Sequence, residues 1–277
     1  MPFPTKLRPH ETDAAYAAAQ KVVETHRRIS TFLKPGVTIA EVDSFVAKTL
    51  ADLGCRSCFL GYRPTRTTPP FPSHSCVSVN DCIVHGTAGS YSKPLGPGDV
   101  LKVDVGVTYQ GWVGDAAWTY MFAPVAPEVR RLADASKEGL RRGIQTLRPE
   151  NTFISWAQVV QDYVEKQCGF HLVRGLGGHG YGRRLHDAPF VANSVPQGLS
   201  IHNEWPDAFT RCMPGTLVAV EPMVAVGTSQ THQKKNEWPI YTADGSMSVH
   251  HEHDVLITEQ GPRILTEGME DLNDVIG

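Results

Sequence analysis

The chain has 277 residues, of which 41% are hydrophobic and 20% are charged, and its formal net charge is -3. This is the composition of one or two ordinary globular domains. Because 26 Lys and Arg residues stand against 29 Asp and Glu residues, there is no basic excess, which argues against nucleic acid or an anionic membrane surface as a partner. We therefore expect a small-molecule or peptide substrate.

Targeting signals and a disulfide framework are also not expected. The N-terminal segment has no apolar stretch typical of a signal peptide, and no apolar run reaches the roughly 20 residues that cross a bilayer. The six cysteines include one close pair, Cys55 and Cys58, which we interpret as reduced core thiols because no second pair of this spacing exists. We expect a cytoplasmic protein with no membrane partner.

Two helices are predicted at the start of the chain. The first runs from about Thr12 to Phe32 and is ended by the Pro-Gly pair at 35–36. The second begins at Thr38, which forms a capping-box pattern with Glu41, and it ends at Gly54.

The same plan returns later in the chain. A helix opens at Pro127, and a second one, capped by Thr152, ends near Gly169. An offset of 114 residues aligns the end of the helix at 12–32 with the end of the helix that opens at Pro127. An offset of 117 residues aligns the apolar strand around Asp104 with the strand around Glu221. We therefore predict one α+β domain over residues 1–277, built from two similar halves at about 12–122 and 127–266.

Carboxylates stand inside these apolar strands. Asp104 is followed, eleven residues later, by Asp115 on a second predicted strand, and a hairpin centred between Tyr109 and Gln110 would set the two directly opposite each other. Such neighbours lie about 5 Å apart, where two negative charges repel. A divalent metal ion between them would remove the repulsion, whereas a slip in register would separate them. Glu221 occupies the matching place in the second half.

A glycine-rich segment follows from Gly175 to Gly182. Its spacing satisfies a dinucleotide-binding pattern, but no amphipathic helix follows and no βαβ unit surrounds it, so we reject that function. The glycines are expected to bring the backbone close to a metal ion or a substrate and to present His179 as a ligand, with His186 at the mouth of the same site. The alternative is a loop histidine that hydrogen-bonds only to backbone.

The last candidate strand begins at His250 and carries Glu252. Strand alternation puts His250 and Asp254 on the face of Glu252, and the histidines at 251 and 253 on the other face. No HExxH helix occurs, which excludes a thermolysin-like zinc site. The remaining donors suit two divalent ions that share carboxylate oxygens: Asp104, Asp115, His179, Glu221 and Glu252.

Taken together, these motifs resemble the type I methionine aminopeptidases. The resemblance extends from about Lys6 to Thr266 and rests on Val103 to Gly106, Gly114-Asp115, Gly178 to Arg183, His186 to Pro189, Val220 to Val224, His251 to His253 and Asn80 to Gly86. It implies the pita-bread fold, two pseudo-symmetric halves around a curved antiparallel sheet with helices outside. It also implies removal of N-terminal methionine before a small second residue. The implied partners are the N-termini of newly made polypeptides, met near the ribosome, and the implied state is a monomer.

The resemblance further implies how the metal ions are held. Asp104 would bind one ion, Asp115 and Glu252 would bridge both, and His179 and Glu221 would complete the other. The ions would be two divalent cations, drawn from Co, Mn, Fe(II), Zn and Ni, and the ligand types do not choose among them.

Roles toward the substrate follow from the same resemblance. Glu221 would accept a proton from the attacking water, His186 would hydrogen-bond the scissile carbonyl, and His85 would hold the substrate backbone. The residues implied to line the methionine pocket are Phe59, Tyr62, Phe71, Cys76 and Trp238, with Leu185 in place of an expected aromatic residue.

Some positions depart from the family pattern. Asp187 replaces a Glu, Gly106 replaces a Thr, and alanines follow Asp115. The loops 62–76 and 193–211 are long, and we expect both to border the pocket. The competing hypotheses are an Xaa-Pro aminopeptidase or dipeptidase of the same fold and a catalytically silent binding relative.

Overall fold

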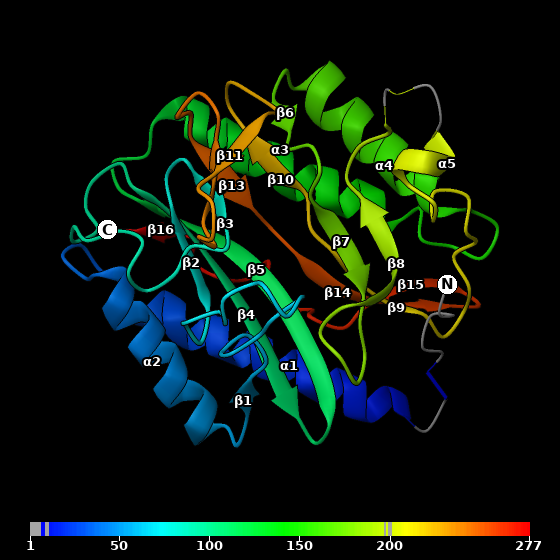
Figure 1. The fold of residues 1–277 in the computed structure, drawn as a ribbon, viewed down its shortest axis with the longest axis horizontal. Coiled ribbons are helices and arrows are strands. Elements are labelled where there is room, and N and C mark those ends of the chain that lie inside the picture. The colour runs from blue at the N-terminus through cyan, green and yellow to red at the C-terminus, as the bar shows by residue number, and fades with distance from the viewer. Residues whose placement is uncertain (1–6, 9–10, 197, 199–200) are drawn as a thin grey trace.

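The computed structural model describes residues 7–8, 11–196, 198 and 201–277 (Figure 1). The helices are α1 (Thr12–Phe32), α2 (Ile39–Asp52), α3 (Pro127–Ile144), α4 (Phe153–Gln161), which continues as a π-helical turn over Asp162–Gln167, and the short α5 (Ile201–Glu204). The strands are β1 (Arg56–Ser57), β2 (Cys76–Val79), β3 (Cys82–Val84), β4 (Val100–Tyr109), β5 (Trp112–Phe122), β6 (His171–Leu172), β7 (Gly177–Gly180), β8 (Asp187–Ala192), β9 (Leu217–Val220), β10 (Met223–Ala225), β11 (Thr231–Gln233), β12 (Ile240–Thr242), β13 (Ser248–His250), β14 (His253–Thr258), β15 (Gly261–Ile264) and β16 (Val275–Ile276).

The predicted helices are confirmed, with one correction to a cap. At the start of α2, the Thr38 hydroxyl accepts a hydrogen bond from the Glu41 amide at 3.3 Å, and the Glu41 carboxylate accepts one from the Thr38 amide at 2.8 Å. Thr152 does occupy the N-cap position of α4, but its side chain makes no capping hydrogen bond. Its backbone instead forms an isolated β-bridge with Arg211.

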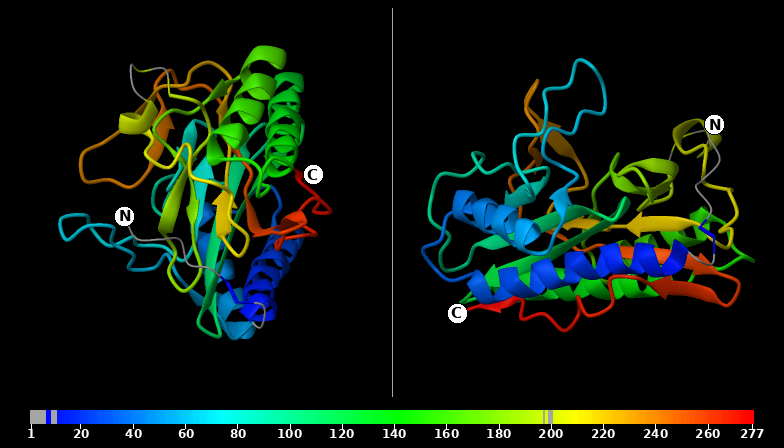
Figure 2. Two further views of the ribbon diagram at one scale, coloured as in Figure 1. Left: turned by 90° about the vertical axis from the view of Figure 1, so that its right-hand side faces the viewer. Right: turned by 90° about the horizontal axis from the view of Figure 1, so that it is seen from below.

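Two five-stranded sheets carry most of the structure. One has the order β1-β4-β5-β16, with β2 also paired to β4, and the other has the order β15-β14-β9-β7-β8. Two three-stranded sheets, β13-β10-β6 and β11-β12-β3, complete the set. In Figure 2 (right), α1 and α3 lie on one side of the strands, whereas the hairpin of β11 and β12 projects from the opposite side. The site described below opens on that opposite side.

Two of the groups of buried apolar side chains each join a pair of helices to neighbouring strands. One group joins α1 and α2 to β4 and β5, and it includes Val22, Val46 and Trp118. Another joins α3 and α4 to β9 and β14, and it includes Trp156 and Val218. Each helix thus buries its apolar stripe against a neighbouring sheet, as amphipathic helices do. The internal repeat and the single-domain boundary stay predictions. Within the described residues, no helix combines the length and the apolar character of a membrane span.

Close packing of β7 against β9 yields a stability prediction. A Cβ atom added to Gly178 would lie 2.1 Å from the carbonyl oxygen of Ala219, which is backbone and has no room to move. We expect Gly178→Ala to lower the free energy of unfolding by at least about 2 kcal/mol, as overpacking does. Gly89→Ala is the control, because Gly89 is exposed and has no heavy atom within 4 Å of an added Cβ. Urea unfolding measures both, and equal stability of the two variants would contradict the packing argument.

Candidate metal centre and substrate pocket

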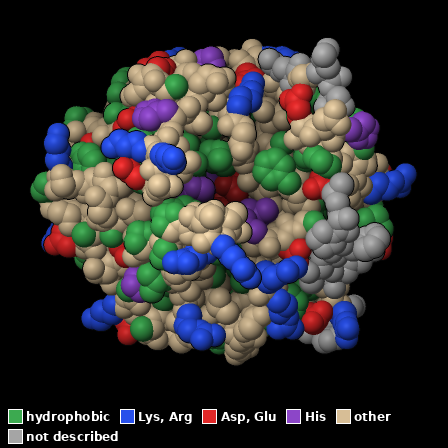
Figure 3. Space-filling model, in the orientation of Figure 1, with side chains coloured by type: hydrophobic (Ala, Val, Ile, Leu, Met, Phe, Trp, Pro, Cys, Tyr) green, Lys and Arg blue, Asp and Glu red, His purple; other side chains and the backbone are tan. Residues whose placement is uncertain are grey.

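A cavity of about 310 Å³ opens on the face shown in Figure 3. Figure 3 shows a hollow in the middle of this face, with acidic and histidine side chains in it and hydrophobic side chains around it. The structure brings every predicted site residue to the lining of this cavity. These residues are Phe59, Tyr62, Phe71, Cys76, His85, Asp104, Asp115, His179, Leu185, His186, Glu221, Trp238 and Glu252. Pro64 also lines the cavity. Residues up to 193 positions apart in sequence are therefore neighbours in one site.

Asp104 and Asp115 come from the hairpin of β4 and β5, and the predicted register of this hairpin is wrong by two residues. The turn lies at Gln110 and Gly111, which both have positive φ angles, of 49° and 77°, as a two-residue hairpin turn requires. Asp104 consequently pairs with Ala117 and lies diagonal to Asp115. Because residues two apart on a strand share a face, both carboxylates still point to the same side.

His179 is supplied by β7, which lies between β8 and β9. Its Nδ1 lies 3.1 Å from the carbonyl oxygen of Gly180, so a proton on Nδ1 leaves the lone pair of Nε2 free. Nε2 lies 3.9 Å from an oxygen of Asp115 and 3.8 Å from an oxygen of Glu221. The glycine at 178 serves strand packing rather than the expected approach to metal or substrate, because it lies against β9.

Two overlapping groups of donor atoms lie at the bottom of the cavity. Glu221 directly follows β9, and Glu252 lies between β13 and β14, where its amide donates to a carbonyl of β5 at 2.9 Å. Among the described residues, one group able to hold an ion consists of Asp115, His179 and Glu252, and a second consists of Glu221, His250 and Glu252. In each group the donor atoms lie within 4.8 Å of one another. Since both groups include Glu252, the two positions are adjacent.

The electrostatics of this cluster favour cations. Burial, followed by the charge of Glu221, raises the pKa of Asp104 to about 8. Burial and neighbouring carboxylates raise the pKa values of Asp115, Glu221 and Glu252 well above their usual range. One oxygen each of Asp104 and Asp115 is buried without a hydrogen-bond partner. Buried charges require neutralisation by a cation or by protons, so the donor set fits divalent metal ions.

His85 and His186 line the same cavity as this cluster. The His186 ring lies 4.2 Å from that of His179 and 5.1 Å from that of Tyr62, and the His85 ring lies 6.1 Å from that of Trp238, centroid to centroid. Burial lowers the pKa of His85 to about 4, and burial lowers the pKa of His186 as well. Both imidazoles are therefore neutral near pH 7, and each has one N–H to donate.

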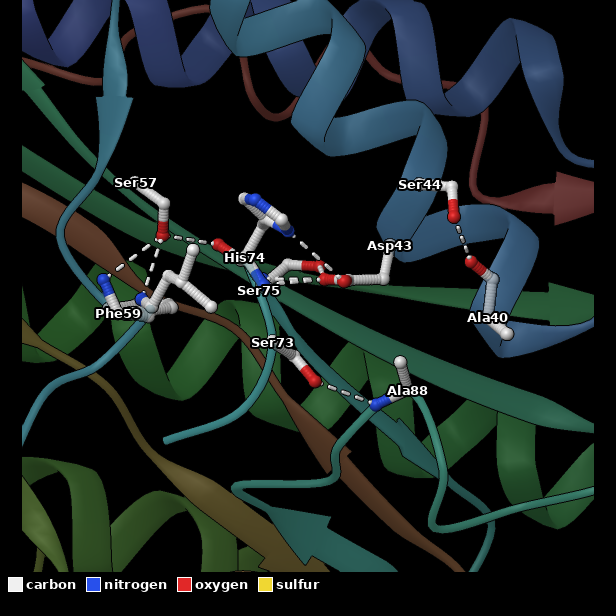
Figure 4. A network of polar contacts seen from close by, with 10 residues as sticks. Ala40, Asp43, Ser44, Ser57, Phe59, Ser73, His74, Ser75 and Ala88 are labelled. Carbon is white, nitrogen blue, oxygen red and sulfur yellow. Dashed lines mark hydrogen bonds and ion pairs between the residues drawn. The ribbon is translucent and has the colours of Figure 1, made fainter. Parts of the chain in front are cut away.

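A polar network fixes the wall of the cavity, and Figure 4 shows it. One carboxylate oxygen of Asp43, on α2, accepts hydrogen bonds from the amides of His74 and Ser75 at 2.9 and 2.8 Å. The Ser57 hydroxyl donates to the carbonyl of His74 at 2.7 Å and accepts from the amide of Phe59 at 3.1 Å. Asp43 of α2 thereby holds one end of the segment that carries the aromatic lining, and Ser57 of β1 ties the two ends of that segment together.

The two long loops differ in where they lie. The loop 62–76 borders the cavity, as expected. The expectation for 193–211 is wrong: its described residues contribute nothing to this cavity, and several of them line another one, of about 430 Å³. Residues 197 and 199–200 of this loop lie outside the described part of the chain. The loop lies away from this cavity because Trp205 is fully buried in the apolar group around α3 and α4, and its Nε1 donates a hydrogen bond to the carbonyl of Phe190 at 2.9 Å.

Gly106, one of the departures from the family pattern, has a local explanation. It pairs with Asp115 across the hairpin. A Cβ atom here would lie 2.4 Å from the Phe59 ring and 2.5 Å from the sulfur of Cys58. The glycine therefore lets the Phe59 wall approach β4 beside the carboxylates. All six cysteines are free, and Cys55 and Cys58 form no disulfide.

Two further residues at the site were not assigned from the sequence. Nε2 of His250 lies 3.3 Å from Oε2 of Glu221. A carboxylate oxygen of Asp254 accepts a hydrogen bond from the amide of Asp115 at 2.8 Å. Strand alternation placed His250 and Asp254 on the same face as Glu252, so the sequence did indicate that both lie near the site. His251, by contrast, turns toward the core, where its Nδ1 lies 2.9 Å from the hydroxyl of Ser136.

Comparisons with known proteins agree over nearly the whole chain. A methionine aminopeptidase of Aquifex aeolicus is 35% identical over 257 residues, which are 93% of this chain and 96% of that protein. The crystal structure of a methionine aminopeptidase from Thermotoga maritima has a TM-score of 0.84 and 31% identity, and it covers 95% of this chain and 99% of that one. An Xaa-Pro dipeptidase from Bacillus anthracis has a TM-score of 0.72 at 21% identity, a likeness of fold alone, and the match covers 95% of this chain and 62% of that one.

Residues 13–259 match the model of metallopeptidase family M24. The architecture described above, mixed helices and sheets around a central site, is the pita-bread fold of these relatives. The chain belongs to metallopeptidase family M24.

Proposed function

We propose that the protein holds two divalent metal ions through Asp104, Asp115, His179, Glu221 and Glu252. The observation that supports this most strongly is the meeting of four carboxylates and one imidazole in the lining of a single cavity, with Asp115, Glu252 and His179 buried and Asp104 and Glu221 partly buried. Among the described residues, Asp104 belongs to neither of the two donor groups, so its assignment rests on the sequence and on its place in the lining. The shared carboxylate of Glu252 and the adjacency of the two donor groups favour two ions over one. Such a ligand set accepts Co, Mn, Fe(II), Zn or Ni.

We propose that the reaction is removal of N-terminal methionine from polypeptides. Divalent ions, when bound, supply Lewis acidity and lower the pKa of water. Glu221 then serves as the proton acceptor, and His186 donates a hydrogen bond to the scissile carbonyl as charge develops on its oxygen. His85 holds the substrate backbone. The aromatic and apolar wall, which includes Phe71 and Trp238, gives the methionine side chain an apolar environment.

The Xaa-Pro alternative has weaker support. The proline-directed relative is similar in fold alone, and the matched part is 62% of its length. Relatives named methionine aminopeptidase match over almost their whole length and at higher identity. A catalytically silent relative is disfavoured because all five donor positions carry ligand residues.

We further propose the setting in which the protein acts. Its substrates are the N-termini of newly made polypeptides, met in the cytoplasm and close to the ribosome, and it acts as a monomer preferring a small residue after methionine.

Substrate choice separates the two enzyme hypotheses. Metal-free protein reconstituted with Co(II), Mn(II) or Fe(II) should release Met from Met-Ala-Ser and leave Ala-Pro-Ser intact, measured by chromatography of the products. Asp115→Asn, which removes a charged donor, should lose activity by more than about 100-fold. Cleavage of Ala-Pro-Ser alone would overturn the methionine assignment in favour of the proline-directed one.

His186 is predicted to act mainly on the transition state. His186→Gln should lower kcat by about 100- to 1000-fold, because an oxyanion donor is lost or misplaced, with little change in KM. His202→Gln, on α5 and outside the cavity lining, is the matched control and should leave both constants unchanged. A kcat within threefold of wild type for His186→Gln would remove this role from the mechanism.

Metal removal should make stability depend on pH. Between pH 6.5 and 8 the folded apoprotein keeps protons on Asp104 and its neighbours that the unfolded chain has released. Buried histidines such as His179, whose pKa is lowered from 6.5 to about 3, are neutral in the folded protein, whereas the unfolded chain still binds some histidine protons near pH 6.5. This opposes the trend by a few tenths of a kcal/mol for each histidine, and it does so equally with and without metal. Because stability falls with rising pH when the folded state binds more protons, the free energy of unfolding of the apoprotein should fall from pH 6.5 to 8 by at least about 1–2 kcal/mol relative to that of the metal-loaded protein, which is the contribution of Asp104 alone.

Urea unfolding at a series of pH values tests this prediction. The metal-loaded protein is the comparison, and its stability should change less over the same range because the ions replace the protons. Equal slopes for the two forms would show that these carboxylates are not the groups that respond to the metal.

A further inference from the structure

His250 is held rigidly beside the proposed metal centre. It lies at the end of β13, paired with Met223 of β10, and only 2% of the residue is exposed. Its amide donates to the Thr119 hydroxyl at 3.0 Å, and its carbonyl accepts from the same hydroxyl at 2.7 Å. The backbone is therefore fixed by strands on two sides, which leaves the imidazole few orientations.

The imidazole faces one oxygen of Glu221. Its Nε2 lies 3.3 Å from Oε2 of Glu221 and 3.9 Å from Oε2 of Glu252. This buried nitrogen has no aligned hydrogen bond, and a buried N–H left without a partner is unfavourable. The other oxygen of Glu221, Oε1, lies 3.8 Å from Nε2 of His179. Glu221 thus stands between two imidazoles, and each imidazole faces a different oxygen.

We propose that His250 is a positioning residue for Glu221, an inference that rests on the function proposed above. Its Nε2–H donates a hydrogen bond to Oε2 of Glu221, which keeps Oε1 directed toward the ion that His179 holds. Hydrogen bonds at catalytic sites are often long before ligands bind and shorten afterwards, so the 3.3 Å contact is a reasonable starting geometry. Loss of a residue that hydrogen-bonds a metal ligand commonly weakens metal binding by about 10- to 100-fold.

Three substitutions separate the hydrogen bond from simple filling of space. His250→Leu removes the donor, His250→Gln keeps an N–H that reaches the carboxylate, and His250→Asn keeps an N–H that is one methylene shorter. His251→Gln is the matched control, because His251 is equally buried and its side chain contacts Ser136 on the other face.

Calorimetric titration of metal-free protein with Co(II) gives the first readout. His250→Leu and His250→Asn should weaken binding of one of the two ions by about 10- to 100-fold, whereas His250→Gln should stay within about threefold of wild type. The leucine and asparagine variants should also lower kcat more than they change KM. Wild-type affinity in His250→Leu, or equal losses in His250→Gln and His250→Leu, would overturn the proposal. If His250→Leu does not fold, the comparison of His250→Gln with His250→Asn tests the proposal, and equal metal affinities of these two variants would overturn it.

X-ray absorption at the cobalt edge tells a positioning residue from a direct ligand. The imidazole contribution should vanish in His179→Gln and stay unchanged in His250→Gln. A reduced contribution in His250→Gln would make His250 a ligand and contradict the positioning role. Failure of the wild-type protein to bind Co(II) at all would instead refute the proposed metal centre, so the two failures are distinguishable.

Discussion

Repulsion among four carboxylates, two of them buried and two partly buried, is the constraint on which the rest of the structure depends. Asp104, Asp115, Glu221 and Glu252 line one cavity, and burial raises their pKa values because each charged form has lost water without gaining a nearby cation from the chain. A fold that accepts such a cluster must supply positive charge from outside. Divalent ions do so and also provide the chemistry of a metallopeptidase.

The donor residues lie on, or at the ends of, paired strands, which hold them in place. Two carboxylates come from the long hairpin of β4 and β5, and Glu221 and Glu252 come from the ends of strands in the later part of the chain. Strand pairing on both sides of β7 sets the direction of His179. The pocket wall is irregular backbone, but Asp43 ties it to α2, so the lining is fixed nearly as well as the ligands.

Much of this was readable from residue types and spacing. Helix ends followed from capping and from proline and glycine. Carboxylates inside apolar strands pointed to Asp104, Asp115 and Glu221, which the structure places around one cavity. The hairpin register was missed because the turn chemistry of Gln110 and Gly111 depends on two positive φ angles that no residue pattern specified. The path of 193–211 was missed because it is decided by burial of Trp205, which is a tertiary contact. His250 was on the correct face, but its distance from Glu221 required the structure.

Anomalous X-ray diffraction from crystals of the cobalt-loaded protein tests the central claim most directly. The account predicts two strong peaks in the cavity, each about 2.0–2.3 Å from its donor atoms, with Asp115 and Glu252 reaching both and His179 reaching one. A cavity without anomalous peaks, or a single ion bound away from these five residues, would contradict it.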